Sequence, residues 1–228
     1  CLGAAVCDLV AEEIAGQHSM YVMAALKRHF LAVAVLCLCQ LPVSASACDA
    51  PEAVCMWADR IVGIKTPNMI ASGTMIADGF VFTNRHVAED HARVMTRDIK
   101  GRIRTATPLA HNFAADLVIL RMEGAAGVPD MAPAVADGKP QELHVVAFDQ
   151  GRNGPRVYAA GDFALYPAAD ASSRARIHTN ARALLGNSGG AVVDKNGQLV
   201  GILASGDGKI SEVVPVTHIA SVLQYTNP

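Results

Sequence analysis

Three residues that lie far apart in the chain have the side chains needed for acyl-transfer chemistry. Ser188 lies in the segment GNSGG, between an Asn and two glycines. A serine hydroxyl is unreactive at neutral pH unless a neighbouring base takes its proton. His86, in GFVFTNRHVAED, can act as that base, and Asp116, in FAADLVILR, can hold the imidazole in the required tautomer. Backbone N–H groups beside the glycines can stabilise an oxyanion, because no side chains there obstruct the donors.

None of these three residues is diagnostic by itself. A single His at a strand end is usually structural or lies at the surface, and an Asp that begins an apolar strand usually caps it or forms an ion pair. Glycines weaken regular structure, and they are expected where backbone angles are unusual or another group approaches closely. The combination of all three types with these glycines favours catalysis.

The elements that must position these residues are short strands in two groups, separated by a Pro-, Ala- and Gly-rich connector at 123–140. The first group of predicted strands is 69–77, 80–83, 93–96, 102–107 and 117–121. The second group is 143–148, 156–166, 174–179, 191–194, 198–204 and 212–216.

Turn and helix signals complete this pattern. Asp78-Gly79 and Asn196-Gly197 are typical of tight hairpins between strands. Only residues 217–225 have a helical pattern. Many short strands with one terminal helix indicate an all-β protein, either a sandwich or barrels.

Three segments carry a resemblance to a known family. SGTMIADGFVFTNRHV, AADLVIL and GNSGGAVVDKNGQLVGI, in that order, resemble the trypsin-like serine peptidases, most closely the bacterial high-temperature-requirement (Htr) branch. The order His, Asp, Ser is that of the chymotrypsin clan. The resemblance covers about residues 58–226 and implies two six-stranded antiparallel β-barrels, at about 56–125 and 138–216. The short C-terminal helix would follow at about 217–225.

The resemblance also implies roles for individual residues. Ser188 would be the nucleophile, His86 the general base and then the general acid, and Asp116 the group that orients His86. The backbone N–H groups of Gly186 and Ser188 would form the oxyanion hole. The implied activity is that of a serine endopeptidase, which cleaves proteins or peptides through an acyl-enzyme without a metal or cofactor.

Substrate preference is less defined. Arg182, Ala204, Ser205 and Gly206 would line the pocket for the side chain before the cut. The small residues fit a modest apolar pocket, whereas Arg182 would either favour acidic side chains or be a solvated loop residue. Ala204 occupies a position where many relatives supply a hydroxyl to the triad Asp. Htr proteins add a PDZ domain after the protease; none is expected here, which is compatible with a monomer.

The segment DRIVGIK, 59–65, looks like a zymogen cleavage site of the trypsin kind. In trypsins the freed N-terminus pairs with an Asp immediately before the nucleophile. Asn187 occupies that position here. The sequence therefore predicts no activation by cleavage after Arg60.

The N-terminal region has the pattern of an export signal. Basic residues at 27–29 precede an apolar run at 30–41 and then the small-residue motif Ala45-Ser46-Ala47. The run is shorter than the about 20 residues of a membrane span. We interpret 20–47 as a cleaved signal peptide, with a signal anchor as the alternative. Residues 1–19 would be an upstream segment and 48–228 the protease domain, with no membrane span after cleavage.

Cleavage would leave two cysteines, Cys48 and Cys55, which in an exported protein predict a disulfide. Lipid modification of Cys48 is the alternative, although Ala45 stands where a lipobox usually has Leu. The protein would be periplasmic or secreted in the first case and lipid-anchored in the second.

Composition narrows the classes of function. The net charge of the 228 residues is −2 and no run of Lys or Arg is present, so nucleic acid is not an expected partner. A catalytically silent binding module with the protease fold is the main alternative to an enzyme. Metal binding is weakly indicated, because His86 and His91 lack the spacing of a helical metal motif.

Overall fold

The computed structural model describes residues 48–77, 79–88, 90–112, 114–124, 142–165, 167, 172, 174–215 and 217–218. The predicted signal peptide, the segment before it and all of the connector except Glu123 and Gly124 lie outside these residues. Of the helix expected at 217–225, only Thr217 and His218 are described, and both are helical. Within the described ranges, no helix has the length and apolar character to cross a membrane.

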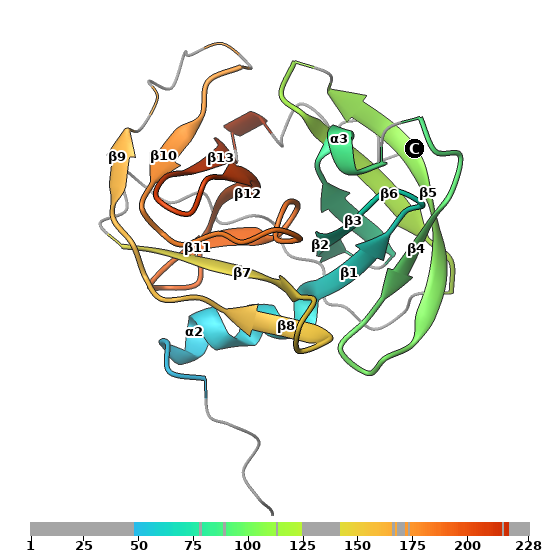
Figure 1. The fold of residues 1–228 in the computed structure, drawn as a ribbon, viewed down its shortest axis with the longest axis horizontal. Coiled ribbons are helices and arrows are strands. Elements are labelled where there is room, and N and C mark those ends of the chain that lie inside the picture. The colour runs from blue at the N-terminus through green and yellow to red at the C-terminus, as the bar shows by residue number, and fades with distance from the viewer. Residues whose placement is uncertain are drawn as a thin grey trace, which may run out of the picture. The chain divides into compact units, whose positions relative to one another are not determined.

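The first group of strands forms a closed antiparallel barrel, as predicted (Figure 1). Its strands are β1 (Ile61–Lys65), β2 (Ile70–Ala77), β3 (Phe80–Thr83), β4 (Val94–Arg97), β5 (Ile103–Asn112) and β6 (Leu117–Met122), in the order β1-β2-β3-β6-β5-β4. The sequence analysis did not place β1. Its first four residues are all buried, so this strand lacks the alternation of apolar and polar residues that identifies a half-buried strand.

The second group forms a seven-stranded sheet that is not closed among the described residues. Its strands are β7 (Leu143–Asp149), β8 (Gly154–Val157), β9 (Phe163–Leu165), β10 (Ile177–Thr179), β11 (Ala191–Asp194), β12 (Leu199–Gly206) and β13 (Ser211–Pro215), in the order β8-β7-β11-β12-β13-β10-β9.

The prediction of a second closed six-stranded barrel is therefore not confirmed among the described residues. The segment predicted as one strand, 156–166, is divided between β8 and β9, with Gly161 in between. Gly161 meets Leu143 of β7 in an isolated bridge, through N–H···O bonds of 2.8 and 2.9 Å. A single bridge does not extend into the ladder that would be needed to close the sheet.

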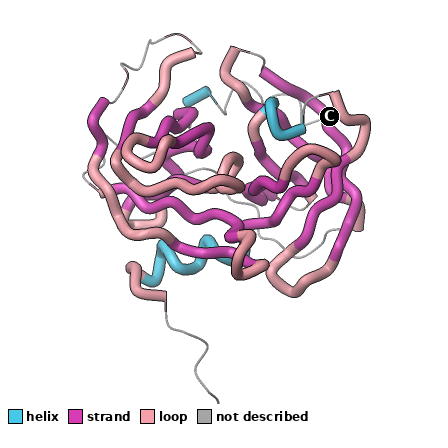
Figure 2. The backbone as a smooth tube through the Cα atoms, in the orientation of Figure 1, coloured by secondary structure: helices cyan, strands magenta, loops and turns pink. Residues whose placement is uncertain are grey.

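Helical structure is limited to single turns in most of the described chain (Figure 2). α2 (Glu52–Cys55) continues into the 3-10 helix η1 (Met56–Arg60), and α3 (Arg85–Ala88) follows β3. Such short helices show too few apolar repeats to be predicted from periodicity. The predicted disulfide between Cys48 and Cys55 is present and encloses α2. The indole N–H of Trp57 donates to the carbonyl of Gly197 at 2.9 Å, which ties η1 to the turn between β11 and β12.

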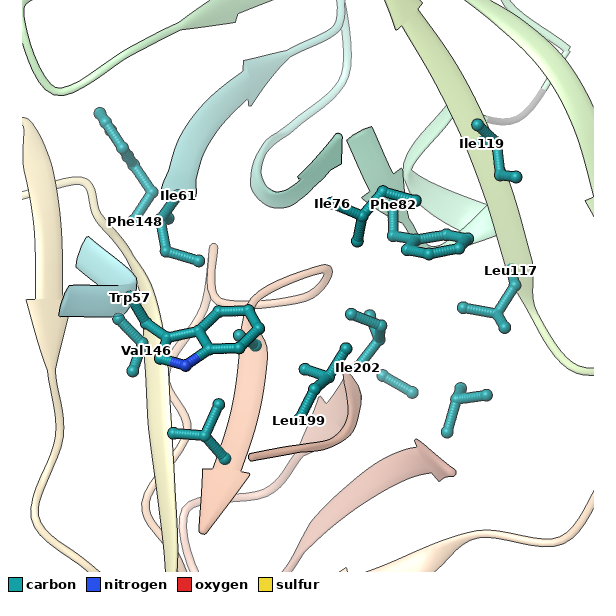
Figure 3. Packing of buried hydrophobic residues seen from close by; sticks show 14 of the residues in the cluster. Trp57, Ile61, Ile76, Phe82, Leu117, Ile119, Val146, Phe148, Leu199 and Ile202 are labelled. Carbon is teal, nitrogen blue, oxygen red and sulfur yellow. The ribbon is translucent and has the colours of Figure 1, made fainter. Parts of the chain in front are cut away.

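One of the apolar clusters joins the barrel to the sheet. Phe82 and Leu117 come from the barrel, Val146 and Ile202 from the sheet, and Trp57 from η1 (Figure 3). Burial of each large apolar side chain contributes about 1.5–3 kcal/mol. Residues of the two groups of strands are therefore held in fixed contact.

Candidate active site

His86 and Asp116 form a direct pair within the barrel. His86 lies in α3, and Asp116 lies immediately before β6. The His86 Nδ1 atom is 2.9 Å from Asp116 Oδ2, and the backbone N–H of His86 donates to Oδ1 at 3.1 Å. In the described part of the chain, no other residue bonds to this carboxylate. The pair fixes the ring orientation and leaves Nε2 as the nitrogen that can exchange a proton with a nucleophile.

The backbone at Asp116 is in the left-handed region, with a φ of 57°. A non-glycine residue in this region costs about 1–3 kcal/mol and persists where the surroundings impose it. Here the carbonyl of Asp116 accepts hydrogen bonds from Asn84 Nδ2 at 3.2 Å and from the N–H of Arg85 at 3.1 Å. The TNRH segment thus binds both the main chain and the side chain of Asp116.

Ser188 lies in the turn before β11 and is half-buried. Its hydroxyl donates to the carbonyl of Ala204 at 3.0 Å. No hydrogen bond joins it to His86, although both residues are described. The serine rotamer in this structure is therefore not the one from which His86 could take the proton.

Two backbone donors beside this hydroxyl are unused. Neither the N–H of Gly186 nor that of Ser188 donates to an acceptor in the described residues. Gly186 has a φ of 92°, which a residue with a side chain rarely adopts. A Cβ there would also collide with the amide of Gln150. The turn thus presents the predicted pair of oxyanion donors without competing acceptors.

The side chain of Asn187 stabilises the turn that contains Ser188. It is almost completely buried, and its Oδ1 accepts from the N–H of Leu184 at 2.7 Å. Its Nδ2 donates to the carbonyl of Phe148 at 3.1 Å and to the hydroxyl of Tyr158 at 3.0 Å. Burial raises the pKa of Tyr158, which the bond from Asn187 partly opposes. These uncharged hydrogen bonds order the turn that precedes Ser188.

Ser72 was missed by the sequence analysis and connects β2 to the turn of the nucleophile. It is fully buried, and its N–H donates to the carbonyl of Ser188 at 2.8 Å. Its hydroxyl donates to the carbonyl of Gly186 at 2.8 Å and accepts from the N–H of Phe148 at 2.9 Å. A buried hydroxyl needs partners, so a polar residue in an otherwise apolar strand was the available signal.

Gly189 allows this close contact between the turn and β2. A Cβ at this position would overlap the carbonyl oxygen of Ser72 and the hydroxyl of Thr83, and its φ is 89°. Thr74 adds a bond from its hydroxyl to the carbonyl of Gly189 at 2.9 Å. One of the glycines beside the nucleophile is therefore required by packing against the barrel.

The predicted pocket residues differ in their surroundings. Ala204 is buried, whereas Arg182, Ser205 and Gly206 are exposed. The Ser205 hydroxyl donates to Oε2 of Glu212 at 3.0 Å, a carboxylate that the sequence analysis did not include. The rim of the predicted apolar pocket therefore also carries a negative charge.

The described residues contain no group of three His, Cys, Asp or Glu side chains that could hold a metal ion. One ring nitrogen of His86 is already bonded to Asp116. The candidate site is thus built from a hydroxyl, an imidazole, a carboxylate and backbone donors.

Comparison with family models gives a match to the trypsin-like peptidase domain over residues 71–202. This region is more than half of the chain and contains His86, Asp116 and Ser188. The chain belongs to the trypsin-like peptidase domain family. A search of curated proteins found no match.

Solved structures of proteases have a similar fold to this trypsin-like peptidase domain. The Rv3671c protease in an inactive form is 18% identical, with a TM-score of 0.63, and the match covers 80% of this chain and all of the other. A serine-to-alanine mutant of Rv3671c from Mycobacterium tuberculosis is 19% identical, with a TM-score of 0.63 and coverage of 78% and 92%. A serine endoprotease from Yersinia pestis is 23% identical, with a TM-score of 0.63 and coverage of 75% and 64%.

Proposed function

We propose that this trypsin-like peptidase is an exported serine endopeptidase with Ser188, His86 and Asp116 as its catalytic triad. The observation that carries the proposal is the 2.9 Å contact between His86 Nδ1 and Asp116 Oδ2, in a chain whose turn at Ser188 also presents two unused N–H donors. A binding surface alone would not need an oriented imidazole beside a strained Asp.

The proposed reaction begins when the Ser188 hydroxyl leaves the carbonyl of Ala204 and turns to Nε2 of His86. Its oxygen attacks the scissile carbonyl carbon while Nε2 takes the proton, and Asp116 stabilises the imidazolium. The N–H groups of Gly186 and Ser188 donate to the oxyanion. His86 then protonates the leaving amine, the C–N bond breaks, and water hydrolyses the acyl-enzyme with the same proton transfers in reverse order.

The export part of the proposal is supported by the signal-peptide pattern at 20–47 and by the disulfide between Cys48 and Cys55. Disulfides persist in oxidising compartments. The bond also occupies the Cys48 sulfur to which a lipid would be attached, which favours a periplasmic or secreted protein over a lipid-anchored one.

A catalytically silent binding module is the second candidate. The observation in its favour is the hydrogen bond from the Ser188 hydroxyl to Ala204, which leaves the nucleophile without its base. Covalent labelling of the serine separates the two candidates.

The experiment expresses the full chain in an exporting bacterial host and treats the purified protein with a fluorophosphonate probe, with Ser188→Ala as the control. Intact-mass analysis reports the attached probe, the N-terminus and the loss of two hydrogens at the disulfide. We expect an N-terminus at Cys48, and labelling of the parent but not of Ser188→Ala. A folded parent that takes up no probe would leave the binding module as the better description.

A further inference from the structure

A groove of about 300 Å³ lies on the outer face of the barrel, and none of the three triad residues lines it. Ile70, Met95 and Ile103 line it with apolar side chains that are 40%, 48% and 68% exposed. Lys65 and Arg97 line it as well. Large apolar side chains gathered in an exposed groove indicate an interaction surface.

Strand register connects this groove to the candidate active site. On one row across the barrel, Ile70 of β2 pairs with Lys65 of β1, which pairs with Met95 of β4. Directly opposite residues project from the same face of a sheet. These three side chains therefore form a continuous row.

The neighbouring row begins at Ser72, beside the turn of the nucleophile. Ser72, which bonds to the carbonyl of Ser188, pairs with Gly63, then Arg97 and then Ile103. Three strand spacings of about 4.8 Å separate its ends, so the row is about 14 Å long. An extended chain of about four to five residues covers this length. Ser72 and Gly63 are themselves buried, so a substrate chain would span this distance alongside the row, past the exposed Ile70.

The open sheet supplies the opposite wall of the groove. The ring of Phe148 lies over Gly63, where an added Cβ would be 2.9 Å from the ring. Asn153, in the turn before β8, accepts a hydrogen bond from Arg97 Nη1 at 2.5 Å. At the end near the nucleophile, Gln150 donates to the carbonyl of Ile70 at 3.2 Å. The groove is therefore bounded on both sides rather than being a flat sheet face.

The chemistry of the lining selects the kind of segment that fits. Two of the lining residues, Lys65 and Arg97, are cationic and none of those in the described chain is acidic. Asp98, which follows Arg97, is already bound by Arg102 and Arg104 at 2.6 and 2.9 Å. The groove is complementary to an extended segment that alternates apolar and acidic side chains.

The position of the groove indicates which side of the scissile bond of the substrate it binds. Ser188 contacts β12 through its hydroxyl and β2 through its carbonyl. Three of the four residues expected to bind the side chain before the cut are in β12, and the groove begins at β2. We propose that the groove binds the leaving-group side of an unfolded protein substrate, through a segment rich in apolar and acidic residues. This inference rests on the proposed peptidase function.

The test uses two quenched-fluorescence peptides that share one cleavable sequence, selected from a peptide library. After the cut, one continues as Leu-Asp-Leu-Glu-Phe-Asp-Leu-Glu and the other as alternating Gly and Ser. For the exported protein we expect KM to be about tenfold lower for the apolar and acidic peptide, as burial of one large side chain would produce. The double variant Met95→Ser/Ile103→Ser should remove this difference.

Two further variants test whether the difference in KM comes from the groove. Lys65→Glu should weaken only the acidic peptide, whereas Leu109→Ser, an exposed residue of β5 outside the groove lining, should change nothing. The rate of fluorophosphonate labelling should be equal in all of them. An equal KM for both peptides in the parent, or an unchanged difference in the double variant, would overturn the proposal.

A binding experiment distinguishes failure of the groove proposal from failure of the proposed peptidase function. Fluorescence anisotropy with Ser188→Ala measures binding of the Leu-Asp-Leu-Glu-Phe-Asp-Leu-Glu peptide without any turnover. Binding that is lost in Ser188→Ala/Met95→Ser/Ile103→Ser supports the groove even if the parent takes up no probe. If the peptide does not bind and the double variant instead dissociates a dimer in sedimentation, the groove is an interface between copies of this chain.

Discussion

The barrel and the open sheet hold their parts of the candidate site in different ways. The barrel is closed, and its His86–Asp116 pair is already assembled at 2.9 Å. Among the described residues the sheet is open, with β8 and β9 as its edge strands, and its Ser188 hydroxyl bonds to Ala204 of β12. The acid–base pair is thus preorganised, whereas the nucleophile needs a change of rotamer.

The His86–Asp116 part of the site is therefore expected to be rigid, and the turn of Ser188 is expected to be adjustable. A closed barrel satisfies all its strand edges, which leaves few ways for α3 and Asp116 to separate. The turn of Ser188 depends on contacts from outside the sheet, above all on Ser72 of β2. Contacts between the two regions should therefore contribute to catalysis in addition to the triad residues.

The largest effects should come from the two halves of the triad. Ser188→Ala should lower kcat on the order of a million-fold, by loss of the nucleophile. Asp116→Asn should lower kcat on the order of ten-thousand-fold, because the imidazole is held in the wrong tautomer. Both are measured on one peptide substrate, with thermal unfolding to confirm the fold. An Asp116→Asn enzyme within tenfold of the parent would show that the barrel does not supply the acid–base pair.

Ser72→Ala should break the connection between barrel and sheet. The N–H of Phe148 loses its acceptor and the carbonyl of Gly186 its donor, so the oxyanion donors are misplaced. We expect kcat to fall on the order of a hundredfold, the effect of losing one such donor, with KM nearly unchanged.

The matched control is Thr66→Ala, which removes a buried hydroxyl that bonds within the β1–β2 loop. It should leave kcat unchanged. Equal losses of kcat in both variants, or a rise in KM alone for Ser72→Ala, would contradict a positioning role for Ser72.

Removal of the disulfide should affect the sheet more than the barrel. Cys48→Ser/Cys55→Ser frees the short loop around α2, and its free energy of unfolding should fall by about 2 kcal/mol. The bond from Trp57 to Gly197 links this segment to the β11–β12 turn, so amide exchange should rise there first. Denaturant unfolding and hydrogen exchange measure the two effects. Faster exchange in the strands of the barrel instead would contradict this localisation.

The smallest expected effect is an acid dependence in the barrel. Burial opposes ionisation of Asp98, but bonds from the backbone and side chain of Arg102 and from Arg104 outweigh it and hold the pKa below its ordinary value of 3.8. Because the folded pKa is depressed, the stabilisation is present above pH 3.8 and is lost as pH falls through the folded pKa.

Asp98→Asn should therefore be less stable than the parent by about 1 kcal/mol near neutral pH. The difference should shrink below pH 3.8, which thermal unfolding at several pH values measures. A constant difference at all pH values would assign the loss to packing instead of charge.

Most strands could be predicted because their signals are local. Strands β2 to β4, β6, β7 and β11 lie within about two residues of the expected ranges, since alternation and turn dipeptides act over a few positions. The prediction failed at β1, which is buried on both faces, and at 156–166, which divides at Gly161. Both failures depend on neighbours that are distant in the sequence.

By itself, the sequence determined which residues can do chemistry, their order, the two groups of strands and the pairing of Cys48 with Cys55. These follow from residue types and short spacings. Only the tertiary structure decided how the second sheet is ordered in the described residues, that Ser188 bonds to Ala204, and that Ser72 contacts the turn of the nucleophile. The physical reason is that sheet closure, rotamer and buried partner depend on packing between segments that are not neighbours in the sequence. Ser188 and Ala204 are separated by 16 residues, and Ser72 and Gly186 by 114.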